Sequence, residues 1–188
     1  YTLLPTYNFL FDGNHEGNNE SIWEANGEGW SSPIGAWCTS MFQGVDWKKF
    51  NTPSNALNKA FVDSGDNQRK TASIKRQNVS WSDNYWPSFQ CPFANKLRKT
   101  DGTQNFYIFR LGDIILLKAE ALANTGNLTG AMTLVNQVRA RVGLAAVTPA
   151  TTQDEAIMTI LNERFLELSF EGHRWFDLKR TGKAVQIL

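Results

Sequence analysis

The stretch ERFLELSFEGHRWFDLKRTG, residues 163–182, is the densest run of charged and aromatic residues in the chain. Glu163, Glu167 and Glu171 recur every four residues, so on a helix they lie along one face. The paired carboxylates of a glycoside hydrolase must instead face each other across a sugar. Partly buried charges are normally paired with opposite charges. We therefore interpret the run as a structural charge network and assign no catalytic residue to it.

Basic residues within the same run supply the opposite charge. Gly172 interrupts the helical pattern, Arg164 and Arg174 lie on either side of this break, and Asp177 follows it. We expect these groups to neutralise one another, with Arg174 and Asp177 as a structural pair. The residues to which we assign this structural role are Glu163, Arg164, Glu167, Glu171, Gly172, Arg174 and Asp177.

Hydrophobic spacing upstream of the run predicts a helix over residues 106–124. One apolar face begins at Ile108, and a second consists of Ile114, Leu117 and Ala121. A helix with two apolar faces is expected to be buried on two sides.

Two further helices follow. The second is predicted over about 128–141, before the helix-ending Gly143, and the third begins at a capping box of Thr152 and Glu155. The first two helices form a hairpin of about 34 residues, close to the length of a tetratricopeptide unit. One such unit cannot bury its own outer face, so that face must pack on missing helices or on the first part of the chain.

The chain divides into a loop-rich aromatic region, residues 1–104, and a tetratricopeptide-like helical region, residues 105–188. We predict a mainly α fold in which the helices pack with the first region, and we expect little β structure there. Ser21–Ala25 is predicted to be a short strand with Trp23 in the core. Residues 78–105 are predicted to be a long loop.

Six of the seven tryptophans lie in the first region, most of them among Gly, Ser, Asn and Asp. A tryptophan or tyrosine ring has a flat apolar face and a polar handle, which suits the C–H face of a sugar. Core packing is the alternative for each of these rings. The candidate glycan-binding residues are Trp81, Tyr85, Trp86, Trp30, Trp37, Asp83 and Asn84.

Composition narrows the possible functions. The chain has 188 residues, of which 41% are apolar and 20% charged, as in ordinary globular proteins. The net charge is +1 and no basic tract is interleaved with aromatics, so no nucleic-acid partner is expected. No apolar run approaches the roughly 18 residues of a membrane span. The chain opens at Tyr1 without a signal peptide, and we expect an internal fragment of a larger protein.

No metal site and no cofactor are predicted. Cys38 and Cys91 have no zinc-type spacing, and the sequence leaves open whether they pair. The run that begins at Asp12 resembles the start of a calcium loop, but its twelfth position, which needs a bidentate Glu, is Trp23. No nucleotide-binding fingerprint occurs.

Several stretches, in the right order and over most of the chain, resemble the SusD/RagB family. Residues 163–182 are similar to the C-terminal signature of that family. Residues 107–121 resemble its helix containing Arg-Tyr-Ala-Asp, with Leu111 and Gly112 in place of Tyr-Ala. The other matching stretches are residues 19–24, 66–69 and 138–144.

The resemblance implies a mostly helical lipoprotein on the outer face of a Bacteroidetes-type outer membrane. It implies that the protein captures a glycan or oligosaccharide and has a SusC-like TonB-dependent transporter as its partner. The lipid anchor would be on an N-terminal cysteine outside this chain, since neither Cys38 nor Cys91 has a lipobox context. No enzymatic activity is implied.

Two other function classes are compatible with the sequence. A helical-repeat scaffold that binds only protein would need more repeats than the single visible hairpin, and the tryptophan-rich region weakens that interpretation. A glycoside hydrolase would need two carboxylates on facing elements, which the sequence does not establish. Non-catalytic glycan binding is therefore the leading hypothesis, with the identity of the glycan left open.

Overall fold

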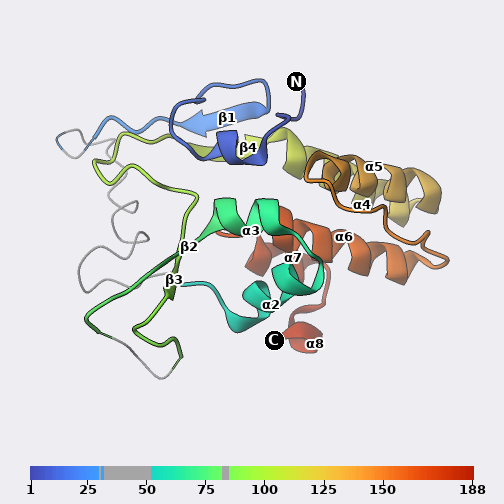
Figure 1. The fold of residues 1–188 in the computed structure, drawn as a ribbon. Coiled ribbons are helices and arrows are strands. Elements are labelled where there is room, and N and C mark those ends of the chain that lie inside the picture. Colours follow the sequence, from blue (N-terminus) through green and yellow to red (C-terminus); the bar gives the residue numbers. More distant parts are fainter. Residues whose placement is uncertain (30, 32–51, 82–84) are drawn as a thin grey trace.

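The computed structural model describes residues 1–29, 31, 52–81 and 85–188 (Figure 1). The described part is mainly helical, as the sequence predicts, with two small antiparallel sheets of two strands each. The predicted residues that lie outside the described part are Trp30, Trp37, Cys38, Asp83 and Asn84.

Helices make up most of the regular structure. They are η1 (Tyr7–Leu10), α2 (Asn55–Asp63), α3 (Asn67–Ser73), α4 (Leu111–Asn124), α5 (Leu128–Arg141), α6 (Gln153–Glu167), α7 (Arg174–Arg180) and α8 (Ala184–Ile187). The strands are β1 (Ser21–Ala25), β2 (Ile74–Gln77), β3 (Cys91–Ala94) and β4 (Phe106–Arg110). β1 pairs with β4, and β2 pairs with β3. None of the helices within the described ranges is long and apolar enough to cross a membrane.

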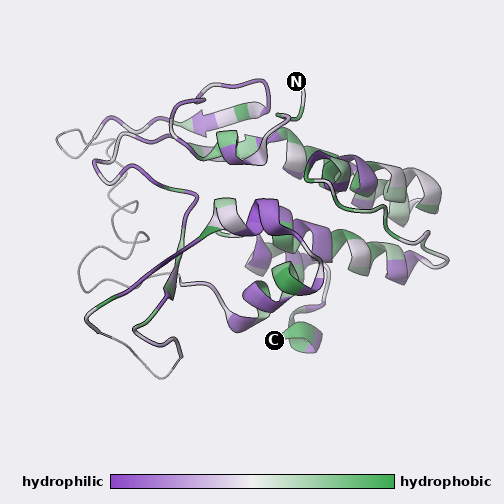
Figure 2. Ribbon diagram, viewed as in Figure 1, coloured by the Kyte–Doolittle hydropathy of each residue, from purple (hydrophilic) through white to green (hydrophobic). Residues whose placement is uncertain are grey.

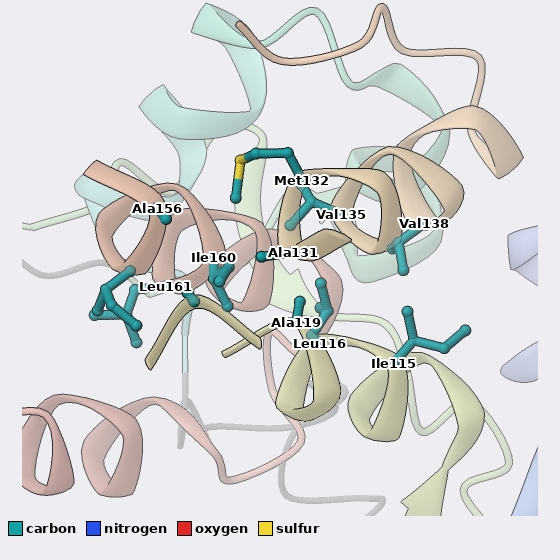
Figure 3. Packing of buried hydrophobic residues seen from close by; sticks show 12 residues of the cluster. Ile115, Leu116, Ala119, Ala131, Met132, Val135, Val138, Ala156, Ile160 and Leu161 are labelled. Atoms are coloured by element: carbon teal, nitrogen blue, oxygen red, sulfur yellow. The ribbon is translucent and has the colours of Figure 1, made fainter. Parts of the chain in front are cut away.

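Helices α4, α5 and α6 enclose the main hydrophobic core, which Figure 3 shows from close by. Leu116, Val135 and Ile160 contribute one large side chain from each helix, and all three are fully buried. Alanines at the remaining contact positions allow the helix axes to approach closely. The fully buried alanines of this core are Ala119, Ala123, Ala131 and Ala156.

The helix ends follow the signals in the sequence. α5 has the predicted bounds, and Gly143 follows it with the left-handed φ of 71° that ends many helices. Both hydrogen bonds of the predicted capping box are present at the start of α6, between Thr152 and Glu155. These local predictions are confirmed because caps and glycine stops depend on neighbouring residues alone.

Residues 106–110 form strand β4, so the predicted start of the first helix at residue 106 is wrong. Arg110, at the N-cap of α4, has an extended backbone with φ −137°. The strand is rich in aromatic and β-branched residues, and it pairs with β1 through partners such as Trp23 and Phe109. Tertiary pairing therefore overrides a hydrophobic spacing that also fits a helix.

Two further expectations for the first region need correction. The predicted loop over residues 78–105 contains strand β3, which closes a hairpin with β2. Trp23 lies in the predicted strand, but 60% of its surface is exposed, so it is not a core residue. It packs on the ring of Phe109, with the ring centres 6.0 Å apart, on a face that no described element covers.

The second apolar face of α4 is also not buried within the described chain. Ile114 and Leu117 are 39% and 37% exposed, whereas Leu116, on the opposite side, is fully buried. Helices α5 and α6 cover only the latter side. Among the described residues, the expectation of burial on two sides is therefore wrong.

Leu116→Ala is expected to lower the free energy of unfolding by about 2–5 kcal/mol, because it leaves a cavity among three helices. Leu188→Ala makes the same chemical change at a side chain that is 83% exposed, and should have almost no effect. Urea unfolding of both variants measures the difference. Equal losses for the two would contradict this description of the core.

Candidate functional site

The Glu167 carboxylate, at the end of α6, is the centre of a buried charge network. Arg110 Nη1 lies 2.6 Å from its Oε1, Arg69 Nη1 lies 3.0 Å from its Oε2, and Arg141 also bonds to it. These arginines come from α3, the junction of β4 with α4, and the end of α5. All four side chains are at most 3% exposed. One carboxylate thus connects four elements.

The rest of the network extends from these arginines. Arg110 also bonds to Glu20 and Glu171, while Arg69 also bonds to Asp66 and Glu163. Five acidic and five basic side chains are joined, so the cluster is electrically neutral, as burial of charge requires. The members are Glu20, Asp66, Glu163, Glu167, Glu171, Arg69, Lys96, Arg110, Arg139 and Arg141.

Helix α3 shows why the network matters for the first region. The helix is largely hydrophilic (Figure 2), so hydrophobic contact alone cannot hold it in place. Arg69 at its centre is nevertheless fully buried, because it reaches Glu163 and Glu167 on α6. Charge pairing therefore attaches this helix to the helical region.

A second, smaller cluster connects α6 to α4 and α7. Arg164 lies 2.7 Å from both Asp113 and Asp177, and Arg180 bonds to Asp177 and Glu120. Asp177 thus pairs with Arg164 and Arg180 rather than with Arg174, which corrects the expected pair. Arg174 instead donates to the Leu161 carbonyl at 3.1 Å. Its guanidinium lies 4.3 Å from the centre of the Phe165 ring.

The network shifts the pKa values of Glu167, Glu171 and Lys96. Burial opposes ionisation of Glu171, but the charges of Arg110 and Lys96 outweigh it and lower the pKa of Glu171 to about 2. Burial similarly opposes ionisation of Glu167, yet its arginines hold that pKa well below its usual range. Burial lowers the pKa of Lys96 to about 8, although Glu171 counteracts this. Ionised carboxylates bonded to arginine serve the fold and are not poised to transfer protons.

Glu171→Gln is expected to make the free energy of unfolding depend less strongly on pH below about 4.5. The pKa of Glu171 is about 2 in the folded chain and about 4.5 in the unfolded chain. Between these two pH values the unfolded chain therefore binds more protons than the folded chain. Stability from ionised Glu171 is therefore complete above about 4.5 and is lost as the pH falls towards 2. At about 1.4 kcal/mol per pKa unit, this amounts to about 3 kcal/mol.

Urea unfolding at pH values from about 5 down to 3 tests this effect. The wild type should lose more free energy of unfolding over that range than Glu171→Gln. Asp63→Asn, which removes a carboxylate from an exposed pair with Lys59, should behave like the wild type. The same loss in Glu171→Gln as in the wild type would contradict the assigned role.

The candidate glycan-binding residues that the structure describes lie in the hairpin between β2 and β3. Tyr85 is 52% exposed and its ring packs edge-on against Trp86, with ring centres 5.7 Å apart. Trp81 lies elsewhere along the hairpin, edge-on to the buried Phe93 at 6.0 Å. The structure thus brings Tyr85 and Trp86 together, whereas Trp81 packs against the buried Phe93.

Trp86 and Tyr85 also attach the hairpin to the start of α2. The Trp86 ring N–H donates to the Pro53 carbonyl at 2.9 Å, and the Asn55 amide donates to the Tyr85 hydroxyl at 2.8 Å. The guanidinium of Arg76 lies 5.7 Å from the centre of the Trp86 ring. Trp86 is therefore half-buried and anchored, and Tyr85 presents the more accessible ring.

Phe89 is an exposed aromatic residue that the sequence analysis did not select. It lies in the same hairpin and is 69% exposed, more than Tyr85. Phe89 lies between the polar Ser88 and Gln90, as the selected aromatic residues lie among polar residues. The sequence therefore already contained the pattern that could have identified it. The candidate binding residues are therefore the two exposed rings of this hairpin, Tyr85 and Phe89, with Trp86 packed against Tyr85.

The fold is that of the SusD-like surface proteins. The structure of surface glycan-binding protein A from Bacteroides uniformis matches with a TM-score of 0.71 and 25% identity, over 98% of this chain and 42% of that one. The same-named protein from Bacteroides thetaiotaomicron, in complex with laminarihexaose, matches with a TM-score of 0.70 and 22% identity, over 100% of this chain and 48% of that one.

The sequence identifies the family. The model of the SusD family matches residues 36–187, and the chain belongs to this family. A SusD-like protein of Formosa agariphila is 46% identical over 92 residues, which are 45% of this chain and 18% of that protein. The chain thus spans less than half the length of these relatives.

Proposed function

We propose that this protein is a non-catalytic glycan-binding protein of the bacterial cell surface. It captures an oligosaccharide and delivers it to a SusC-like TonB-dependent transporter, and a lipid anchors the full-length protein in the outer membrane. Membership of the SusD family supports this proposal. Further support comes from the fold relative in complex with laminarihexaose.

The observation that carries the proposal is the exposed pair Tyr85 and Phe89 on an anchored hairpin. Exposed large aromatic side chains favour association with a ligand. A pyranose ring presents a flat C–H face that stacks on such side chains. Arg76, on β2 of the hairpin, bonds to Asn58 at 2.9 Å, and its guanidinium lies 5.7 Å from the centre of the Trp86 ring. Polar groups that suit sugar hydroxyls therefore lie beside that ring.

The state of the buried carboxylates supports binding over hydrolysis. Glu163, Glu167 and Glu171 are each bonded to arginine and are at most 8% exposed. A glycosidase acid must hold a proton at neutral pH and reach the glycosidic oxygen. A pKa of about 2 for Glu171 is opposite to that requirement.

Tyr85→Ala and Phe89→Ala are each expected to weaken glycan binding. Loss of one stacking ring should cost about 1–3 kcal/mol, or roughly tenfold to a hundredfold in Kd. Isothermal titration with laminarihexaose and a panel of other oligosaccharides measures the effect. Their melting temperatures should stay close to that of the wild type, because both side chains are more than half exposed.

Trp23→Ala is the matched control for these variants. Trp23 is an equally exposed aromatic residue, but it lies on β1, outside the hairpin. It should bind glycan like the wild type. Weakened binding in Trp23→Ala together with unchanged binding in both hairpin variants would place the ligand elsewhere and contradict the assignment.

We also expect no release of new reducing ends when the protein is incubated with an oligosaccharide that it binds. Turnover that disappears on replacement of one carboxylate would establish a glycoside hydrolase. A protein that binds no member of a broad glycan array, yet binds a protein partner, would instead favour the helical-repeat scaffold.

A further inference from the structure

Arg76, on β2, is an exposed side chain that uncharged groups from several parts of the chain hold in place. Its Nη1 donates to the Gln90 carbonyl at 3.0 Å, and its Nη2 donates to the Asn58 side chain, on α2, at 2.9 Å. Its guanidinium also lies 5.7 Å from the centre of the Trp86 ring, which is a cation–π distance. These contacts fix the guanidinium before any ligand binds, so it loses little conformational freedom on binding.

No carboxylate among the described residues neutralises the charge of Arg76. Arg69 and Arg110, by contrast, each bond to more than one carboxylate of the buried network. Asp83 is the one acidic residue between positions 74 and 94, and it lies outside the described part. Arg76 therefore presents a localised positive charge on the described surface of the hairpin.

The polar groups beside this charge are hydrogen-bond donors. A guanidinium has five N–H groups and no acceptor. Gln90 and Asn58 each accept from one N–H group of Arg76, and the others have no acceptor among the described residues. Asn58 accepts through its side-chain oxygen, so its amide nitrogen is a further donor. Donors around a fixed cation are complementary to an anion rather than to hydroxyl groups alone.

The cation lies next to the rings of the proposed glycan site. Trp86 packs edge-on against Tyr85, with ring centres 5.7 Å apart, and Arg76 lies against the same Trp86 ring. One short oligosaccharide can therefore stack on Tyr85 and reach Arg76 with a substituent. We propose that the hairpin binds a glycan with an anionic substituent, a uronate carboxylate or a sulfate ester, and that Arg76 bonds to the anion. This inference rests on the proposed glycan-binding function of the same hairpin.

A broad glycan array that contains matched acidic and neutral oligosaccharides tests the proposal on the full-length protein. The matched pairs are oligogalacturonides with their methyl esters, and sulfated galacto-oligosaccharides with their desulfated forms. Acidic glycans should dominate the bound set, and preference within one kind of pair identifies the carboxylate or the sulfate ester. Binding of neutral glycans alone, or of both members equally, would overturn this inference and leave the proposed function intact. Binding of no glycan would overturn both.

Arg76→Gln measures the contribution of the charge. It should weaken binding of an acidic oligosaccharide by roughly tenfold to a hundredfold, and it should leave the neutral counterpart at its own lower affinity. Arg76→Lys keeps the charge without the planar guanidinium and should recover part of the loss. Added NaCl should weaken acidic binding in the wild type, and much less in Arg76→Gln.

Lys59→Gln is the matched control, because it removes an exposed charge on α2 that Asp63 already neutralises. It should bind acidic glycans like the wild type. A loss in Lys59→Gln as large as that in Arg76→Gln would assign the effect to net charge and overturn the proposal. Equal weakening of acidic and neutral oligosaccharides by Arg76→Gln would also overturn it, since Arg76 would then only support the hairpin.

Discussion

The buried carboxylate of Glu167 fixes the relative positions of α3, the start of α4, the end of α5 and the end of α6. Arg69, Arg110 and Arg141 approach it from three different elements, none of them exposed by more than a few per cent. Loss of one partner from a buried pair leaves an uncompensated charge and typically costs about 3–5 kcal/mol. The aromatic region contributes few apolar residues to the main core. These ion pairs, together with two smaller apolar clusters, hold the two compositional regions together.

The sequence alone indicates the acidic residues of this network better than their basic partners. The spacing of Glu163 and Glu167 places two carboxylates on one side of α6 from local geometry alone. The same spacing predicts Glu171 on that helix face, but α6 ends at Glu167 and Glu171 lies in the turn that follows. Their basic partners come from positions up to 98 residues away, as for Arg69 and Glu167, and no local pattern identifies them. The role of Gly112 likewise depends on distant residues, because a Cβ there would lie 2.6 Å from Arg110 Nη1 and 2.8 Å from Glu167 Oε1. Glycine at this position thus makes room for the ion pair.

The errors of sequence interpretation share one physical cause. Residues 106–110 have apolar spacing that fits both a helix and a strand, and only the distant β1 decides between them. Trp23 lies in a strand as predicted, but a sheet of two strands has one face that its own chain need not cover. The positions of the caps, by contrast, depend on residues three or four apart, and these were predictable. Of the candidate binding surface, the sequence indicated the aromatic residues of a loop, but neither the hairpin that carries them nor which ring faces solvent.

The charge network and the proposed glycan surface are physically connected. Arg69 attaches α3 to α6, and β2 begins directly after α3 at Ile74. The strand carries the hairpin with Tyr85 and Phe89, and the Asn95 amide after β3 returns to the Ser73 carbonyl at 2.8 Å. The hairpin therefore begins and ends on a helix that is held by buried charge. A stacking surface on such a support loses little conformational freedom when a sugar binds, so more of the contact energy remains as affinity.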